Sequence, residues 1–190
     1  MNYMLRTNLQ FLSYIEALYD GSASKDIILR NYSKGSRLLE QNEASNKVFV
    51  IKEGFVKCFN SEQNGKDFIF EFLGKGEIIG EVEALRHVKC ICNVEALSDV
   101  QVYVLSTSFF ASLCDRDRQF SHLLLTELAE RLANTSSRAS YQQLYTVKYA
   151  LSKLFHLQER QNIKLSKMDM ASYLGIDVRS LNRVLKELET

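Results

Sequence analysis

The sequence predicts an α+β protein, with an N-terminal β-sandwich or barrel followed by a long helix and a small helical tail. Between residues 27 and 105, short runs rich in Val, Ile, Phe and Tyr, such as VFVIKEG and DFIFEFL, are separated by glycines. From about residue 106 the apolar spacing becomes helical, and residues 118–145 contain neither Gly nor Pro. A length of 190 residues accommodates one sizeable core and a smaller second unit.

The composition is that of a globular protein without a membrane span. Hydrophobic residues make up 46% and charged residues 25%, and no apolar stretch approaches the roughly 18 residues that a membrane helix needs. The N-terminus lacks the pattern of an export signal, so we expect a cytoplasmic location and no membrane partner. Residues 148–190 hold 8 Lys and Arg against 5 Asp and Glu, a modest basic footprint that is compatible with a nucleic-acid surface.

Short sequence patterns predict the N-terminal helix and one hairpin turn of the β-region. Leu9, Leu12, Ile15 and Leu18 fall on one helical face, which predicts an amphipathic helix that ends near residues 20–21. Among the strands that follow, Asn64-Gly65 predicts a hairpin turn, because both residue types tolerate positive φ.

The long helix at 118–145 carries a seam with spacings of three and four residues, as in a two-stranded coiled coil. The seam predicts that the protein is a homodimer. The alternative is that the same face packs on the β-region. A second amphipathic helix is expected at 148–159. The seam residues are Leu125, Leu128, Leu132, Thr135, Ala139 and Gln142.

Residues 166–189 predict a helix-turn-helix. Ser166 and Asp169 form a capping pair for a first helix, Gly175 permits the sharp turn that ends it, and Asp177 caps the second helix. The small Ala171 lets the two helices approach closely. Residues expected to face inward are Met170, Ala171 and Leu174 in the first helix and Leu181, Val184, Leu185 and Leu188 in the second.

The outer face of the second helix is basic and polar, which is typical of a helix that enters the major groove of double-stranded DNA. Arginine can donate two parallel hydrogen bonds to guanine, so such a face can read sequence. The alternative is a helical hairpin with no nucleic-acid role. The candidate DNA contacts are Ser166, Arg179, Ser180, Asn182, Arg183 and Lys186.

With these motifs in place, the chain resembles the Crp/Fnr family of transcription regulators. The motifs that carry the resemblance are Lys34-Gly35, the strand-turn-strand around Gly54, the hairpin at 64–66 and the run GEIIGE at 76–81. The resemblance implies a jelly-roll β-domain with the cyclic-nucleotide-binding fold at 1–117, a dimerisation helix at 118–145 and a helix-turn-helix DNA-binding domain at 146–190, which in the family is completed by a wing that this chain lacks. It also implies a small-molecule effector, whose identity the sequence does not reveal.

In family members that bind cyclic nucleotides, a phosphate cassette begins at the last of these motifs. Gly80 and Glu81 match the cassette, but Cys90-Ile91 stands where the family has its arginine and Ser/Thr. Arg86 or Lys89 could supply a cation from nearby, although exposed loop cations are usually only solvated. We therefore expect a divergent member whose β-domain does not bind cAMP, with Gly80 and Glu81 retained for turn geometry.

The cysteines offer a weaker sensor hypothesis. Cys90 and Cys92 are two residues apart, so in a strand they would project from one face and could bind a metal or respond to redox state. Fnr-like members carry an iron–sulfur cluster on N-terminal cysteines, but here the first cysteine is Cys58 and no Cys-x₂-Cys run exists. Packing of the β-core is the simpler interpretation. We expect no metal and no cofactor.

The leading hypothesis is a homodimeric, sequence-specific regulator that binds a palindromic operator. The rival is a ligand- or protein-binding module without DNA-binding activity, because the chain ends at Thr190, where the family usually continues with a β-hairpin wing. We find no nucleophile–base motif, P-loop or metal-ligand spacing, so an enzyme is not expected.

Overall fold

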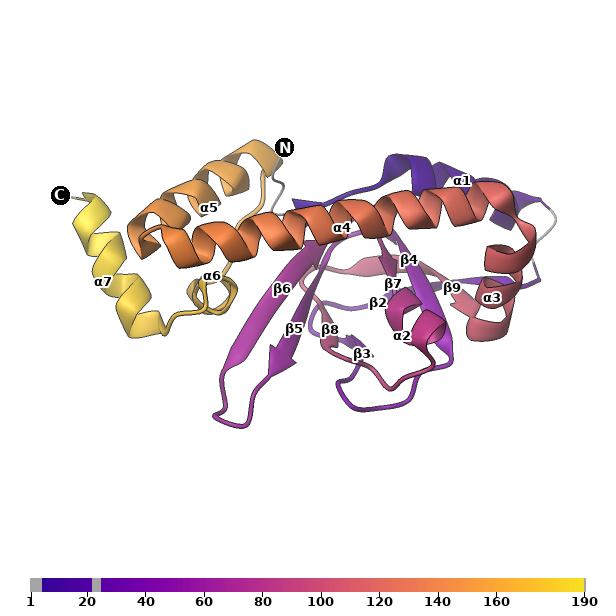
Figure 1. The fold of residues 1–190 in the computed structure, drawn as a ribbon, viewed down its shortest axis with the longest axis horizontal. Helices are drawn as coiled ribbons and strands as arrows, with labels where there is room; N and C mark the ends of the chain where they lie inside the picture. Colours follow the sequence, from indigo (N-terminus) through magenta and orange to yellow (C-terminus); the bar gives the residue numbers. More distant parts are fainter. Residues whose placement is uncertain (1–4, 22–24, 190) are drawn as a thin grey trace.

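The computed structural model describes residues 5–21 and 25–189; Thr190, the last residue of the predicted helix-turn-helix domain, lies outside the described residues. A β-domain occupies one end of the molecule and three shorter helices the other, and the long helix α4 (Arg118–Leu144) runs along both (Figure 1). The order of elements is the predicted α+β arrangement, with strands mainly before residue 107 and helices after it.

Two sheets build the β-domain and enclose a shared hydrophobic core, as a jelly roll requires. In sheet order, the first contains β2 (Ile27–Tyr32), β9 (Val100–Ser106), β4 (Lys47–Glu53) and β7 (Ile78–Ile79). The second contains, again in sheet order, β1 (Leu5–Arg6), β6 (Asp67–Leu73), β5 (Val56–Ser61), β8 (Asn93–Ala96) and β3 (Arg37–Leu39).

The position of β4 between two hydrophobic cores explains why its sequence is continuously apolar. Successive side chains of a strand point to opposite faces. Phe49 and Ile51 enter the core between the two sheets, whereas Val48 and Val50 enter a second core formed with helices. Both faces of β4 are therefore covered, and an alternating pattern would have left one of them polar.

The first two helices flank the β-domain. Helix α1 (Leu9–Asp20) begins at Asn8, whose side chain accepts the Phe11 N–H at 2.9 Å. The prediction that Leu9 lies on its buried face is wrong: Leu9 is 63% exposed, because the buried face follows Phe11, Leu12 and Ile15. The short helix α2 (Glu81–Arg86) follows β7 and begins at Gly80.

At the Asn64-Gly65 turn, Gly65 has a φ of +76° and joins β5 to β6. Helix α3 (Thr107–Arg116) then leads from β9 into α4. The loop therefore follows the sequence signal, and the long helix occupies nearly the whole of its predicted range.

The C-terminal helices are α5 (Val147–Gln161), α6 (Lys167–Leu174) and α7 (Val178–Glu189). Their apolar side chains form a third core that also includes Phe59, Ile69 and Phe72 from β5 and β6. Tyr173 of α6 lies 5.3 Å from Phe72, ring centre to ring centre. The helical end thus packs directly on the second sheet, a contact that the sequence did not predict.

Candidate functional site

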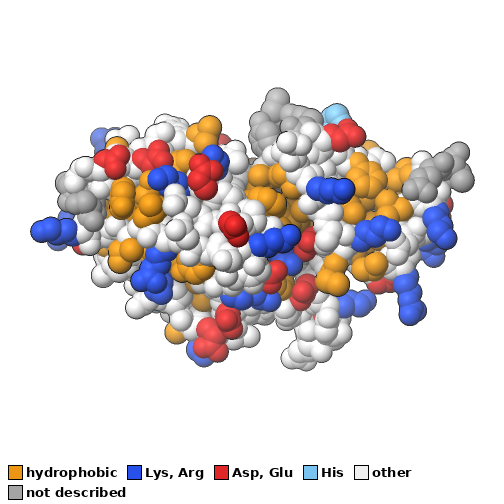
Figure 2. All heavy atoms as spheres, turned by 180° about the vertical axis from the view of Figure 1, so that it is seen from behind, with side chains coloured by type: hydrophobic (Ala, Val, Ile, Leu, Met, Phe, Trp, Pro, Cys, Tyr) orange, Lys and Arg blue, Asp and Glu red, His pale blue; other side chains and the backbone are white. Residues whose placement is uncertain are grey.

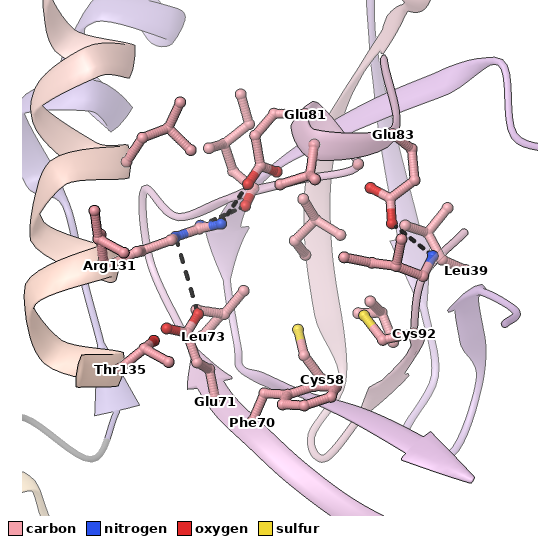
Figure 3. Close-up of a pocket in the computed structure, with 18 residues that line it drawn as sticks. Leu39, Cys58, Phe70, Glu71, Leu73, Glu81, Glu83, Cys92, Arg131 and Thr135 are labelled. Atoms are coloured by element: carbon pink, nitrogen blue, oxygen red, sulfur yellow. Dashed lines mark hydrogen bonds and ion pairs between the residues drawn. The ribbon is translucent and has the colours of Figure 1, made fainter. Parts of the chain in front are cut away.

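A cavity of about 530 Å³ lies between the β-domain and α4 (Figure 3). This is the size of a small-molecule site. Its wall is largely apolar and includes Leu39, Leu73, Ile79 and Val94 from the β-domain and Leu128 and Leu132 from α4. Of its described lining residues, Arg131 is the one with a positive charge, and the carboxylates of Glu71, Glu81 and Glu83 also line it.

Arg131 reaches from α4 to the β-domain and is held there by several acceptors. It donates to Glu81 at 2.5 Å, to the carbonyl oxygen of Ile78 at 2.6 Å and to Glu77 at 3.1 Å. Its Nε also donates to Glu127, one helical turn earlier, at 3.1 Å. Because Glu81 is buried and bonded in this way, its carboxylate is already engaged by the protein.

Glu77 and Glu127 share this buried network with a second cation, Arg6 of β1. Burial raises the pKa of Glu77 to about 7, partly offset by Arg131 and reinforced by the neighbouring carboxylate of Glu127. The pKa of Glu127 is lowered, because Arg131 and Arg6 outweigh its burial. The shared network thus shifts the pKa values of the two carboxyl groups in opposite directions, that of Glu77 upwards and that of Glu127 downwards.

In the cassette region, the side-chain carboxylate of Glu83 accepts a backbone hydrogen bond. Gly80 begins α2 with a φ of +86°, and a Cβ there would lie 2.8 Å from the Lys47 carbonyl oxygen, so the backbone demands glycine. The Ile91 N–H, at the position aligned with the family's Ser/Thr, donates to Glu83 at 3.0 Å. A donor that could hold a phosphate oxygen is thus occupied by a negatively charged side chain.

The other predicted pocket residues lie elsewhere. Arg86 and Lys89 are exposed and are not among the residues that line the cavity. Cys90 is buried beside a different surface hollow, and its backbone is hydrogen-bonded to Asn42 and Glu43. The structure therefore brings Gly80, Glu81 and Ile91 to the cavity together, and it places Cys58 rather than Cys90 beside Cys92 there.

Most of the predicted seam of α4 is exposed in the single chain, although part of it also borders the cavity. Leu125 is 65% and Leu132 70% exposed, and Thr135 and Ala139 are exposed as well. Leu128 is half-buried and packs partly against the core formed with α1 and α3. The alternative that this face packs on the β-domain is therefore wrong for Leu125, whereas Leu128, Leu132 and Thr135 line the cavity beside that domain.

The helix-turn-helix has the capping predicted for it. The Asp169 N–H donates to Ser166 Oγ at 3.0 Å, and the Ser180 N–H donates to Asp177 at 2.7 Å. Gly175 ends α6 with a φ of +69°, in the left-handed region that favours glycine. Of the residues predicted to face inward, Leu181 and Val184 are buried, but Leu188 is exposed at the end of α7.

The candidate DNA contacts lie together on α7 and the start of α6. Arg179, Arg183 and Lys186 are exposed, and Asn182 accepts a hydrogen bond from Lys167 at 3.0 Å. Seen from behind, with the C-terminal helices on the right, Lys and Arg side chains gather at that end among few acidic ones (Figure 2). The surface thus has the charge that favours a polyanion.

Sequence reasoning missed four residues that organise the two sites. Arg131 and Glu83 were not singled out from the sequence, although a charged residue between apolar seam positions is a signal for Arg131. Tyr173 is buried where α6 meets the sheet, and the guanidinium of Arg138 lies 4.9 Å from its ring centre. No local pattern marks either member of that contact, because it joins segments distant in sequence.

This architecture defines a protein with a jelly-roll β-domain, a long connecting helix and a helix-turn-helix. The family pattern of the cyclic nucleotide-binding domain matches residues 29–117, which contain the described lining residues of the cavity other than those of α4. The chain matches the "Cyclic AMP receptor protein" of Thermus thermophilus with 24% identity over 182 residues, covering 90% of this chain and 84% of the relative. The chain thus carries a cyclic nucleotide-binding domain and, over most of its length, is similar to transcription regulators of the Crp/Fnr family.

Two further matches extend over most of the molecule. The "cAMP-activated global transcriptional regulator CRP" of Salmonella typhimurium is 23% identical over 172 residues, which is 85% of this chain and 82% of that protein. The solved structure of the c-di-GMP responsive global regulator CLP from Xanthomonas campestris superposes with a TM-score of 0.81 at 15% identity, covering 96% and 92% of the two chains. The latter shows the shared fold. In the described part of the chain, no helix has the length and apolar character to cross a membrane.

Proposed function

We propose that the chain is a homodimeric, sequence-specific DNA-binding regulator of transcription. The observation that carries the proposal is α7, which is capped at its start and buries Leu181 and Val184 while exposing Arg179 and Arg183. A helix fixed in this way can place its outer side chains on base edges. Phosphate contacts would come from the same basic end of the molecule.

Dimerisation would pair the exposed leucines of α4. Leu125 and Leu132 are one heptad apart, and the seam then continues through Thr135 and Ala139, small enough for two helices to approach closely. A two-fold dimer presents two copies of α7, so its operator should be a palindrome whose half-sites lie about one turn of DNA apart.

Selection of binding sites from random duplexes tests DNA binding directly. We expect recovery of a palindromic sequence whose affinity falls steeply with salt, because Lys and Arg displace counterions from phosphates. Arg183→Ala should weaken binding by about 1–3 kcal/mol and relax the preference at one base position, if this side chain contacts guanine.

Arg30→Ala is the matched control, since Arg30 is an exposed cation on β2 at the other end of the molecule. Its affinity should equal that of the wild type. No preference for any duplex, or equal losses in the two variants, would overturn the proposal.

We infer that the effector of the cavity is not a cyclic nucleotide. A cyclic phosphate would meet the carboxylates of Glu71, Glu81 and Glu83, with Arg131 already bonded to carboxylates and the Ile91 N–H already bonded to Glu83. Burying an anion among anions without a free cation is costly.

Calorimetric titration of the protein with cAMP measures whether the cavity binds a cyclic nucleotide. No saturable heat is expected at concentrations up to about 1 mM, which corresponds to a binding free energy weaker than about 4 kcal/mol. Saturation in the micromolar range would show that Glu83 moves aside and would refute the inference.

A further inference from the structure

Two thiols face the cavity, that of Cys58 from β5 and that of Cys92 from the position just before β8. Both line the cavity, and both sulfur atoms point into it (Figure 3). We propose that Cys58 and Cys92 are a redox-sensitive pair, which a small neutral hydroperoxide converts to a disulfide inside the cavity. The pair differs from the one suggested by sequence spacing, which was Cys90 with Cys92.

Strand pairing brings the two residues within reach. β5 and β8 are antiparallel, and Cys58 is opposite Val94, so Cys92 is its diagonal neighbour. Diagonal neighbours have Cα atoms about 7–8 Å apart, whereas a disulfide usually needs about 4.4–6.8 Å. Closing the bond therefore requires a backbone shift on the order of 1 Å. Cys92 lies outside the ladder of β8, where such a shift breaks no strand pairing.

The surroundings favour a disulfide over a metal thiolate. A hydrogen bond with the Cys92 thiol and complete burial raise the pKa of Cys58, and Glu71 adds to the effect. A bound metal would leave thiolate charge beside the carboxylates that line the same cavity, whereas a disulfide is neutral. The described residues also contain no cluster of three or more Cys, His, Asp or Glu suited to a metal ion.

The reaction begins at Cys92, which is half-buried and more accessible than Cys58. Its thiolate attacks the terminal oxygen of the hydroperoxide, the O–O bond breaks, and the alkoxide takes a proton and leaves as an alcohol. Cys58 then attacks the sulfenic sulfur, and the hydroxyl group leaves as water with the second proton. The two thiols lose two electrons and two protons in all, and the hydroperoxide is reduced to alcohol and water.

Oxidation would also alter the cassette. Ile91 directly precedes Cys92, and its N–H holds Glu83 at 3.0 Å. A shift of Cys92 towards Cys58 pulls on this hydrogen bond. The Ile91 amide should therefore exchange with solvent deuterium faster in the oxidised protein, a readout that is independent of DNA binding.

The test treats the reduced, folded, full-length chain with tert-butyl hydroperoxide and then maps its disulfides by mass spectrometry. We expect one Cys58–Cys92 disulfide, with Cys90 and Cys114 still alkylatable. In Cys58→Ser, the sulfenic acid on Cys92 has no partner, so trapping with dimedone should increase several-fold over the wild type. Because Cys114 lies on α3, outside the cavity lining, Cys114→Ser should behave as the wild type.

Three outcomes would overturn the proposal. They are a Cys90–Cys92 disulfide, four unreacted thiols while the hydroperoxide persists, and equal dimedone labelling of Cys92 in the wild type and in Cys58→Ser. A faster exchange of the Ile91 amide in oxidised Cys114→Ser, but not in Cys58→Ser treated in the same way, would support the linked change at Glu83.

Discussion

Replacing Arg131 by methionine is expected to lower the free energy of unfolding by about 3–5 kcal/mol near pH 8, as is typical when one partner of a buried ion network is removed. Methionine keeps much of the side-chain volume but leaves Glu77, Glu81 and Glu127 without the cation that bridges them. Urea unfolding of the variant and the wild type measures the difference.

The deficit should shrink as the solution is acidified. The pKa of Glu77 is raised to about 7 even beside Arg131, and loss of the guanidinium raises it further. The folded variant then binds protons that the unfolded chain does not, so its stability is greatest below the unfolded pKa and falls as pH rises through the folded pKa. The loss near pH 5 should therefore be clearly smaller than the loss near pH 8.

Arg86→Met is the control, because Arg86 is an exposed arginine at the end of α2. It should change the stability by less than about 0.5 kcal/mol. A similarly small change in Arg131→Met, or a deficit that grows on acidification, would contradict the electrostatic role of Arg131.

The double variant Leu125→Asp with Leu132→Asp is expected to be monomeric and to bind a palindromic duplex about 100-fold more weakly, or worse. Both leucines are exposed in the single chain, so the aspartates should be tolerated by the monomer but not between two α4 helices. Linking two DNA-binding helices in one dimer can raise the affinity for a duplex by about 10²–10⁴, and a monomer lacks this increase. Sedimentation and fluorescence anisotropy measure the two effects.

Leu9→Asp provides the comparison, since Leu9 is 63% exposed on α1 and lies outside the seam. This variant should remain dimeric with unchanged affinity. If the double variant also sedimented as a dimer, the seam of α4 would not be the dimer interface.

Local signals predicted most of the fold. The change from short strands to helical spacing, the capping pair Ser166 and Asp169 and the turn at Gly175 all depend on neighbours in sequence, and each is present. Leu9 was misplaced because an apolar residue in the first turn matched the period without facing the core. In the cassette, the missing arginine was visible from the sequence, but the carboxylate of Glu83 that occupies the Ile91 N–H was not.

What the sequence could not supply are the contacts between distant segments. Arg131 meets Glu81 fifty residues away in the chain, and Lys57 of β5 binds Asp169 of α6 at 2.9 Å. Each side chain alone resembles an ordinary surface charge. Only the packing of α4 and α6 on the β-domain brings these partners together, and no periodicity records that packing.

Strand β6 contributes side chains both to the cavity and to the core that holds the C-terminal helices. Phe70, Glu71 and Leu73 line the cavity, while Ile69 and Phe72 lie in the core that holds the helix-turn-helix. Arg138 of α4 donates to the Ile69 carbonyl oxygen at 3.0 Å and stacks on Tyr173 of α6. If an occupant of the cavity displaced β6, the contact between Phe72 and Tyr173 would carry the movement to α6 directly.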